Sequence, residues 1–234
     1  MPDRFITETP FFTEEQRDLA LSVEGFAARE IEPRAGEEPD VEAQFRALLA
    51  MLAGAGLLRY AVASDGRAID VRSLCLVREA LSYSSSLADL AFVMQGLGTY
   101  AIGVAAPEHV RDFWLARAAT GKAIAAFALT EAGAGSDVAA IETTARRDGD
   151  WYVLDGRKRF ISNAGLADFY TVFARTGTRA DGRAELSAFV VGARMSGFHV
   201  RERTELIAPH PVGEIEFSGC RVPAEDMIGN QGDG

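Results

Sequence analysis

The stretch that decides the fold of this chain is Phe127-Ala128-Leu129-Thr130-Glu131-Ala132-Gly133-Ala134-Gly135-Ser136-Asp137. An apolar run from Ala123 to Leu129 predicts a short strand, and the strand leads into a glycine-rich turn that ends with a hydroxyl and a carboxylate. Glycine lets backbone N–H groups approach a ligand closely, as phosphate and carbonyl oxygens require. The stretch therefore predicts a ligand-binding turn, with a plain glycine turn as the alternative from these residues alone.

A Rossmann-type dinucleotide site does not fit the surroundings of this turn. Gly133-Ala134-Gly135 opens the glycine fingerprint, but its sixth position is Val138. The segment that follows, residues 141–145, favours a strand where the fingerprint needs a helix. Asp155 stands where a ribose-binding acid would be expected, but it belongs to a predicted hairpin.

A second stretch, Gly156-Arg157-Lys158-Arg159-Phe160-Ile161-Ser162-Asn163-Ala164-Gly165, pairs an aromatic ring with a hydroxyl. Because side chains alternate along a strand, we expect Phe160 and Ser162 on the same face. A flat ring system could stack on Phe160 while Ser162 bonds its edge. From this stretch alone, a core role for Phe160 remains the alternative.

The residues around both stretches predict strands, whereas the first half of the chain predicts helices. Predicted strands cover 123–129, 151–154, 169–174, 186–191, 199–203 and 214–217. Predicted helices run from Thr13 with its capping-box partner Gln16 to Pro33, from Asp40 to Gly54 or Gly56, from Asp70 through Leu81, over 90–107, and from Pro107 in the first turn to Ala119.

The predicted fold class is therefore α+β. An N-terminal all-α domain, residues 1–122, precedes an antiparallel β-barrel or sandwich domain, residues 123–234. Several strands at short spacing with polar turns favour this arrangement over βαβ units.

Composition excludes several classes of function. The chain has 234 residues and a formal net charge of −10, and both predicted domains are acidic, which argues against nucleic acid as a partner. The isolated Cys75 and Cys220 are expected to be buried thiols in a reducing compartment. His109, His199 and His210 lack ligand spacing, so no metal site is predicted.

Residues 90–107 carry no charge and approach the length of a membrane-spanning helix. Their glycines and polar residues lower the hydropathy and no basic residue flanks them, so we expect a buried helix of a soluble protein and no membrane span. The N-terminus lacks the pattern of a signal or transit peptide, which predicts a cytoplasmic protein.

Together, the two stretches resemble the acyl-CoA dehydrogenase family, whose β domain carries Thr-Glu-Pro-Gly-Ala-Gly-Ser-Asp and then Lys-x-Trp-Ile-Thr-Asn. Here residues 130–137 have alanine for proline, and residues 158–163 have phenylalanine for tryptophan and serine for threonine. Residues 217–223, Phe-Ser-Gly-Cys-Arg-Val-Pro, also look like a family signature, whereas residues 206–211 depart from the family's Gly- and Arg-containing pattern. The resemblance covers the whole chain.

The resemblance implies FAD as cofactor and an acyl-CoA thioester as substrate. A carboxylate would remove the α-proton while the β-hydrogen passes as hydride to flavin N5. Phe160 would stack on the flavin, Ser162 would bond near N5, and Ser136 would contact the thioester ligand or the phosphate region of FAD. The implied cofactor-binding residues are Phe127, Leu129, Thr130, Gly135, Ser136, Phe160, Ile161 and Ser162. On the uncharged helix Met94, Gln95, Leu97 and Gly98 would line the acyl tunnel, with helix packing as the alternative for each.

In the family the catalytic glutamate comes from a third, helical domain, and this sequence stops at Gly234, where that domain would begin. We therefore assign no catalytic residue and expect a fragment of a homotetrameric dehydrogenase whose electron acceptor the sequence does not identify. The alternatives are half of a split two-chain dehydrogenase, a flavin monooxygenase of the same fold, a dehydrogenase of acyl-carrier-protein thioesters, and a non-enzymatic flavin- or acyl-CoA-binding module.

Overall fold

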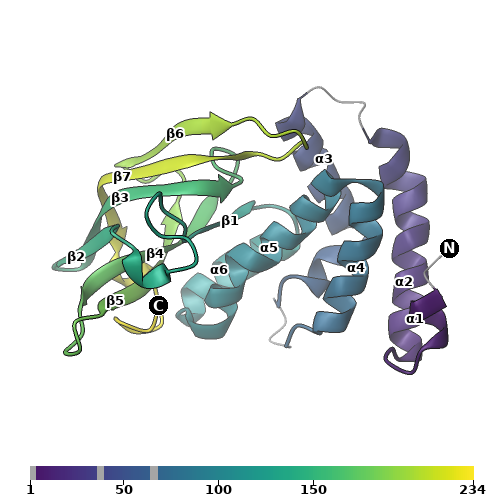
Figure 1. The fold of residues 1–234 in the computed structure, drawn as a ribbon, viewed down its shortest axis with the longest axis horizontal. Helices are drawn as coiled ribbons and strands as arrows, with labels where there is room; N and C mark the ends of the chain where they lie inside the picture. The colour runs from purple at the N-terminus through teal and green to yellow at the C-terminus, as the bar shows by residue number, and fades with distance from the viewer. Residues whose placement is uncertain (1–3, 36–39, 64–67) are drawn as a thin grey trace.

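The computed structural model describes residues 4–35, 40–63 and 68–234, in which helices precede strands (Figure 1). The helices are α1 (Arg4–Glu8), α2 (Glu14–Phe26), α3 (Val41–Gly54), α4 (Val71–Ser84), α5 (Ser86–Ala105) and α6 (Glu108–Ala119), with a π-turn at Ala27–Ile31 and short 3₁₀ turns at Glu32–Arg34, Leu57–Tyr60, Val138–Ala140 and Ala224–Asp226. The strands are β1 (Ala125–Ala128), β2 (Thr144–Asp148), β3 (Trp151–Ser162), β4 (Phe169–Thr178), β5 (Ala184–Gly192), β6 (Phe198–Thr204), β7 (Val212–Pro223) and β8 (Met227–Ile228).

Helices α2, α3 and α4 begin at the caps that the sequence predicts, whereas α1 is not predicted. The Thr13 hydroxyl accepts from the Gln16 N–H and the Gln16 side chain accepts from the Thr13 N–H, so the predicted capping box is confirmed. Asp40 and Asp70 accept backbone N–H groups at the starts of α3 and α4. Helix α3 ends at Gly54, which is one of the two ends that the sequence predicts. These signals are local in the sequence, which is why they could be found there.

Two local predictions are wrong. Pro107 is the N-cap of α6, not its first helical residue, because its extended conformation places its carbonyl to accept the Arg111 N–H at 2.9 Å. Cys75 is exposed, whereas Cys220 is buried. The buried positions of α4 include Leu76, Val77 and Leu81, and Cys75 lies away from that face.

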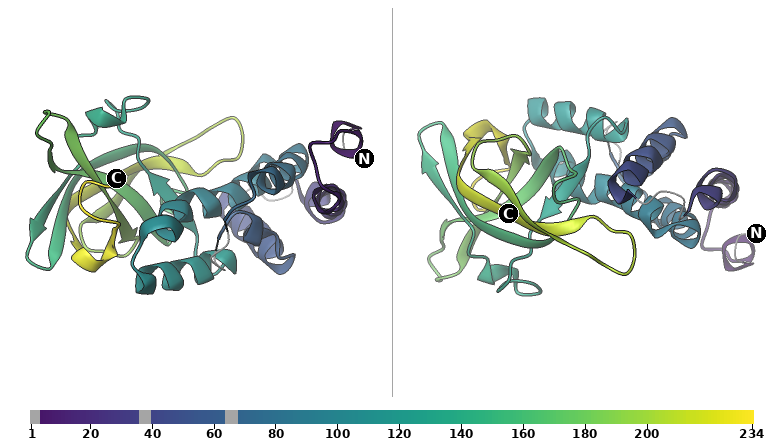
Figure 2. Two further views of the ribbon diagram at one scale, coloured as in Figure 1. Left: turned by 90° about the horizontal axis from the view of Figure 1, so that it is seen from below. Right: turned by 90° about the horizontal axis from the view of Figure 1, so that it is seen from above.

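The strands form one eight-stranded sheet in the order β6-β7-β3-β2-β4-β5-β8, with β1 paired to β4. Most pairs are antiparallel, but β1 runs parallel to β4. The expected helical region followed by a mainly antiparallel β region is confirmed. Figure 2 shows the helices and the strongly twisted sheet side by side, with the N-terminus at the far end from the strands.

The hydrophobic core is continuous from the helices into the sheet. One cluster of buried side chains contains Phe45 of α3 and Phe92 of α5 together with Tyr152 of β3 and Phe189 of β5. Helix α5, which carries no charge after Asp89, connects the two parts, since it contacts α3, α4 and α6 as well as β1. By length and composition α5 is the one membrane-span candidate in the described part of the chain, and half of its apolar window is buried in the fold.

Gly98 lies where α5 packs directly against β1. A Cβ built on Gly98 would lie 2.7 Å from the Cβ of Ala125 and 3.0 Å from the Ala126 backbone. The Gly98 carbonyl also accepts the Thr171 hydroxyl of β4 at 2.7 Å. The α5 backbone must therefore sit directly on the sheet.

We expect Gly98→Ala to lower the free energy of unfolding by about 1–3 kcal/mol, because the added methyl forces helix and strand apart. Denaturant unfolding followed by circular dichroism measures the change. Gly54→Ala is the matched control, since a Cβ there meets no atom within 4 Å. An unchanged midpoint for Gly98→Ala would show that the helix–strand contact is looser than described.

Candidate functional site

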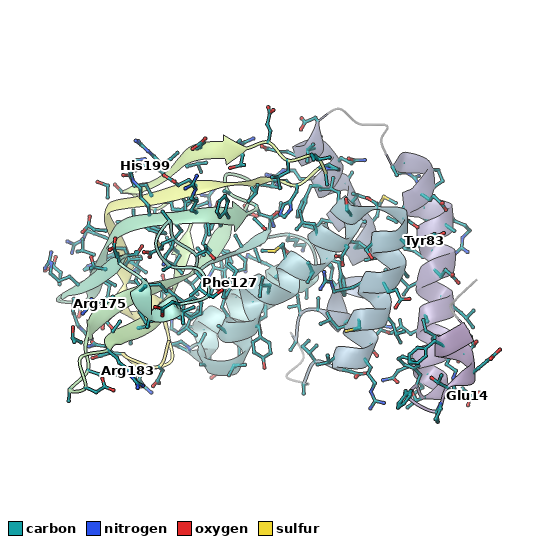
Figure 3. All side chains as sticks on the ribbon, viewed as in Figure 1. Glu14, Tyr83, Phe127, Arg175, Arg183 and His199 are labelled. Atoms are coloured by element: carbon teal, nitrogen blue, oxygen red, sulfur yellow. The ribbon has the colours of Figure 1, made fainter. Side chains whose placement is uncertain are left out.

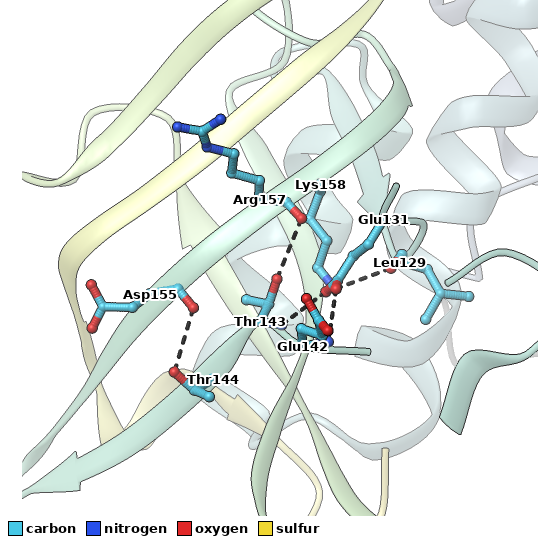
Figure 4. Close-up of polar contacts among 8 residues, drawn as sticks. All are labelled: Leu129, Glu131, Glu142, Thr143, Thr144, Asp155, Arg157 and Lys158. Atoms are coloured by element: carbon cyan, nitrogen blue, oxygen red, sulfur yellow. Dashed lines mark hydrogen bonds and ion pairs between the residues drawn. The ribbon is translucent and has the colours of Figure 1, made fainter. Parts of the chain in front are cut away.

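The two stretches that the sequence singles out are bonded to each other. Lys158 of β3 donates from Nζ to the Leu129 carbonyl at 3.0 Å and to Glu131 Oε1 at 2.7 Å (Figure 4). The backbone N–H of Arg159 donates to the Thr130 carbonyl at 2.8 Å. The turn that follows β1 is thus fastened to the middle of β3 at three consecutive residues.

Glu131 fastens the far side of the same turn. Its carboxylate accepts the Glu142 N–H at 2.7 Å and the Thr143 N–H at 3.1 Å, just ahead of β2. Burial acts to raise the pKa of Glu131, but the hydrogen bonds from Lys158 and from the backbone hold it below the ordinary value of 4.5. Lys158 is fully buried and the Glu131 side chain is 9% exposed. The ion pair cross-links the turn to β3. Because the Glu131 carboxylate is occupied by these hydrogen bonds, it is not free to act as a base.

Phe160 lies at a β-bulge in β3. Its φ is +56°, and the register with β7 shifts between Lys158 and Ile161. A non-glycine residue in the left-handed region costs on the order of 1–3 kcal/mol and persists only when its surroundings impose it. Phe160 is 58% exposed between the buried Lys158 and Ile161. Strict alternation, from which we expected Phe160 and Ser162 on one face, is therefore broken at this point.

The end of β3 is held by the loop between β6 and β7. Ser162 Oγ lies 2.8 Å from Nε2 of His210, and the Asn163 N–H donates to the Pro211 carbonyl at 2.7 Å. The Asn163 amide donates from Nδ2 to the Ala125 carbonyl of β1 at 3.0 Å. Within the described part of the chain, Oδ1 of this fully buried residue has no hydrogen-bond partner. An unpartnered buried oxygen beside both stretches is typical of a place where a ligand donor is expected.

A cavity of about 900 Å³ lies beside β1, between the sheet and the helices. Phe127 forms part of its wall where β1 meets the helices (Figure 3), and its ring centroid is 5.3 Å from that of Phe173. Leu97, Tyr100 and Val104 line the cavity from one side of α5, at helical spacing. The walls are mainly apolar, which suits a hydrocarbon chain or a flat ring.

The predicted site residues fall into two groups. Those open to a ligand are the cavity-lining Phe127 and Leu97, the half-buried Leu129, Thr130 and Ser162, and the exposed Gly135, Ser136 and Phe160. Those in the core are Met94, Gln95, Gly98 and Ile161. Gln95 uses both amide atoms on the backbone, because Nε2 donates to the Ala118 and Ala123 carbonyls and Oε1 accepts the Ala125 N–H. Of the four predicted tunnel residues, the structure places only Leu97 on the cavity.

Lys158, Glu131 and His210 were not predicted as functional residues. A signal for Lys158 exists, because it shares the period-2 face of β3 with the buried Tyr152 and Leu154. A lysine at such a position needs an acidic partner. No comparable signal marks His210, since its contact with Ser162 joins residues on separate elements.

Comparison with known proteins places the chain in a family. The model of the acyl-CoA dehydrogenase N-terminal domain matches residues 13–122, and that of the middle domain matches residues 126–220. A probable acyl-CoA dehydrogenase of Mycobacterium tuberculosis, FadE25, is 33% identical over 226 residues, which is 94% of this chain and 58% of that protein.

Solved structures agree with the sequence matches. The acyl-CoA dehydrogenase of Geobacillus kaustophilus superposes with a TM-score of 0.82 at 28% identity, over 96% of this chain and 60% of that one. An acyl-CoA dehydrogenase of Bacillus anthracis complexed with FAD gives a TM-score of 0.81 at 30% identity, over 97% of this chain and 39% of that one. This chain thus spans less than two thirds of the length of these relatives. With matches to both domain models and a shared fold, the chain belongs to the acyl-CoA dehydrogenase family.

Proposed function

We propose that this chain provides the flavin- and acyl-binding part of an enzyme that dehydrogenates an acyl-CoA thioester between Cα and Cβ. The observation that carries the proposal is the fastening of the turn at residues 129–131 to Lys158 and Arg159, next to the apolar cavity at Phe127. These bonds fix the backbone groups of the turn and the nearby hydroxyls beside the apolar cavity. A flat ligand with a polar edge would contact both. Family membership and the FAD-bound relative support the choice of ligand.

The residues present fit a flavin. Phe160 offers an exposed aromatic face, and the Thr130 hydroxyl makes no hydrogen bond within the described residues. Asn163 adds an unpartnered buried acceptor. When bound, FAD supplies the acceptor for the β-hydrogen of the substrate. The chain's own part is to hold the ring against Phe160, to present Thr130 and Ser162 at its polar edge, and to keep the acyl chain out of water beside Phe127.

We also propose that the base that removes the α-proton lies outside residues 1–234. Glu131 is held as an anion by Lys158 and two backbone N–H groups, and Asp137 accepts the Ala139 N–H at the start of a 3₁₀ turn. A helical segment of the same protein or a partner chain would supply the carboxylate. The genomic sequence after codon 234 tests this. An in-frame helical segment with a glutamate supports a base from the same protein, and an adjacent reading frame that encodes such a segment supports a base from a partner chain. The absence of both segments would contradict the proposal.

The test of the cofactor is a visible absorption spectrum after incubation with FAD and removal of free flavin. It is run on residues 1–234 and on the protein in its genomic length. We expect flavin to remain bound to at least one of these forms, with its absorption band shifted from that of free FAD. If neither form retains flavin, the proposed function is wrong.

In the flavin-binding enzyme we expect Ser162→Ala to slow reduction of the flavin by acyl-CoA about tenfold or more, since one donor at the reacting edge is worth roughly 1.4 kcal/mol or more in the transition state. Binding of the thioester should change less. Stopped-flow bleaching of the flavin band measures both quantities. Ser218→Ala, at an exposed position of β7, is the control. An unchanged reduction rate would remove Ser162 from this role.

A homotetramer, a separate electron acceptor and a cytoplasmic location stay predictions. The dehydrogenase of acyl-carrier-protein thioesters and the flavin monooxygenase remain the competing functions. Turnover of acyl-CoA without O₂ consumption would distinguish the proposed enzyme from the monooxygenase.

A further inference from the structure

The loop between β6 and β7 brings a histidine to the predicted flavin edge. His210 lies between Pro209 and Pro211, and the Pro211 carbonyl accepts the Asn163 N–H at 2.7 Å. Proline fixes φ on both sides of the histidine, and the bond to Asn163 ties the loop to the end of β3. The imidazole is thus held beside Ser162 by backbone constraints, with Nε2 at 2.8 Å from Oγ.

A serine hydroxyl has one proton, so its partner decides where that proton points. If Nε2 of His210 carries the ring proton, it donates to Oγ and leaves the Ser162 proton free for a ligand. If Nε2 lacks a proton, it accepts the Ser162 proton and the ligand meets only an oxygen lone pair. The orientation of the hydroxyl is therefore set by the tautomer of His210.

The surroundings of the ring favour a neutral imidazole with its proton on Nε2. Burial lowers the pKa of His210 from its ordinary value of 6.5, which keeps the ring neutral at pH 7. Within residues 4–35, 40–63 and 68–234, Oγ of Ser162 is the hydrogen-bonding group in range of the ring, and it faces Nε2. Nothing in that part of the chain holds a proton on Nδ1, whereas a catalytic His that accepts a serine proton has an acceptor there.

We propose that His210 is a positioning residue, which donates from Nε2–H to Ser162 Oγ and thereby presents the Ser162 hydroxyl as a donor to the reacting edge of the flavin. The inference rests on the flavin binding proposed above. His210 touches neither cofactor nor substrate in this scheme, and its effect passes through Ser162.

The first arm of the test needs no cofactor. Long-range ¹H–¹⁵N correlation spectra of the ¹⁵N-labelled chain report the tautomer of each of its three histidines, and His210→Gln identifies the His210 signals by their loss. We expect an Nε2-protonated ring whose Nε2 shift changes in Ser162→Ala. An Nδ1-protonated ring, or nitrogen shifts that do not respond to Ser162→Ala, would overturn the proposal.

The second arm measures FAD affinity in the flavin-binding form by quenching of flavin fluorescence. His210→Phe and Ser162→Ala should each weaken binding about 3- to 10-fold, the range of one hydrogen bond. The double variant should bind FAD no more weakly than the single variant with the lower affinity, because both substitutions remove the same donor. His210→Gln should restore most of the affinity for FAD, since the glutamine side-chain N–H extends about as far as Nε2 of histidine and can donate to Ser162 Oγ.

Effects that multiply in the double variant, or a failure of His210→Gln to restore binding, would assign His210 a separate structural role and contradict the proposal. Circular dichroism of each variant shows whether the fold is kept, and His210→Gln keeps the test decisive if His210→Phe unfolds. If the wild-type protein binds no FAD, the proposed function fails, while the spectra of the first arm still decide whether His210 orients Ser162.

Discussion

Lys158→Met will lower the free energy of unfolding by about 3–5 kcal/mol, the range for removing one partner of a buried ion pair. The methionine fills most of the lysine volume, so the loss comes from charge and hydrogen bonds rather than from a cavity. Glu131 would remain as a buried anion without its cation, and the Leu129 carbonyl would lose a donor. Because both bonds fasten the turn at residues 129–131, flavin binding should be lost as well.

Denaturant unfolding and FAD titration measure the two effects. Lys122→Met is the matched control, since Lys122 is exposed and the same change there should leave both quantities within about 0.5 kcal/mol. The double variant Lys158→Met/Glu131→Leu should recover part of the stability, because no buried charge is left unpaired. Equal stability of Lys158→Met and Lys122→Met would contradict the cross-link.

Glu131 also gives the stability a pH dependence with a definite sign. The pKa of Glu131 is held below 4.5 in the folded protein, so its stabilisation is fully present above pH 4.5 and is lost as the pH falls through the folded pKa. In Glu131→Gln this part of the acid destabilisation should be absent. Parallel stability profiles of wild type and variant below pH 4.5 would show that Glu131 carries no lowered pKa.

The sequence predicts the starts of α2, α3 and α4, because a cap depends on neighbouring residues, whereas α5 begins at Ser86 and not at residue 90. A capping box needs only Thr13 and Gln16, and the glycine turn after β1 is contiguous. The bulge is different. No glycine or asparagine at position 160 announces a left-handed residue, and the conformation of Phe160 is imposed by contacts of β3 with β7 and with the turn after β1.

Pairs of residues far apart in the chain could not be predicted for the same reason. Lys158 meets Glu131, and Ser162 meets His210, only once strands and loops are placed beside one another. Helix α5 is the clearest example, because after Asp89 it has apolar, small or neutral polar residues on every side. Which side faces the cavity is decided by how it packs on β1, where only glycine fits at position 98. Leu97 consequently faces the cavity, whereas Met94, Gln95 and Gly98 do not.

Gln95→Leu should distinguish a structural role from the predicted tunnel role. Gln95 is fully buried and joins three elements, since its amide bonds the Ala118 carbonyl of α6, the Ala123 carbonyl and the Ala125 N–H at the start of β1. Leucine has a similar volume but offers no hydrogen bonds. The Ala118 carbonyl keeps the Gly121 N–H, so the Ala123 carbonyl and the Ala125 N–H are the groups that lose their partner. At roughly 1–3 kcal/mol for each, we expect the free energy of unfolding to fall by about 2–5 kcal/mol.

The control is Gln44→Leu, where a half-buried glutamine of α3 makes one bond, to the Arg34 carbonyl, and where a loss of about 0.5–1.5 kcal/mol is expected. Thermal and denaturant unfolding measure both variants, and acyl-CoA affinity is measured on the folded fraction. A tunnel-lining Gln95 would give the opposite pattern, in which stability is kept and acyl-chain preference changes. Because Gln95 bonds the backbone on both sides of the link between α6 and β1, its loss should loosen the junction ahead of the turn at residues 129–131. If that turn binds flavin as proposed, affinity for FAD should fall together with stability.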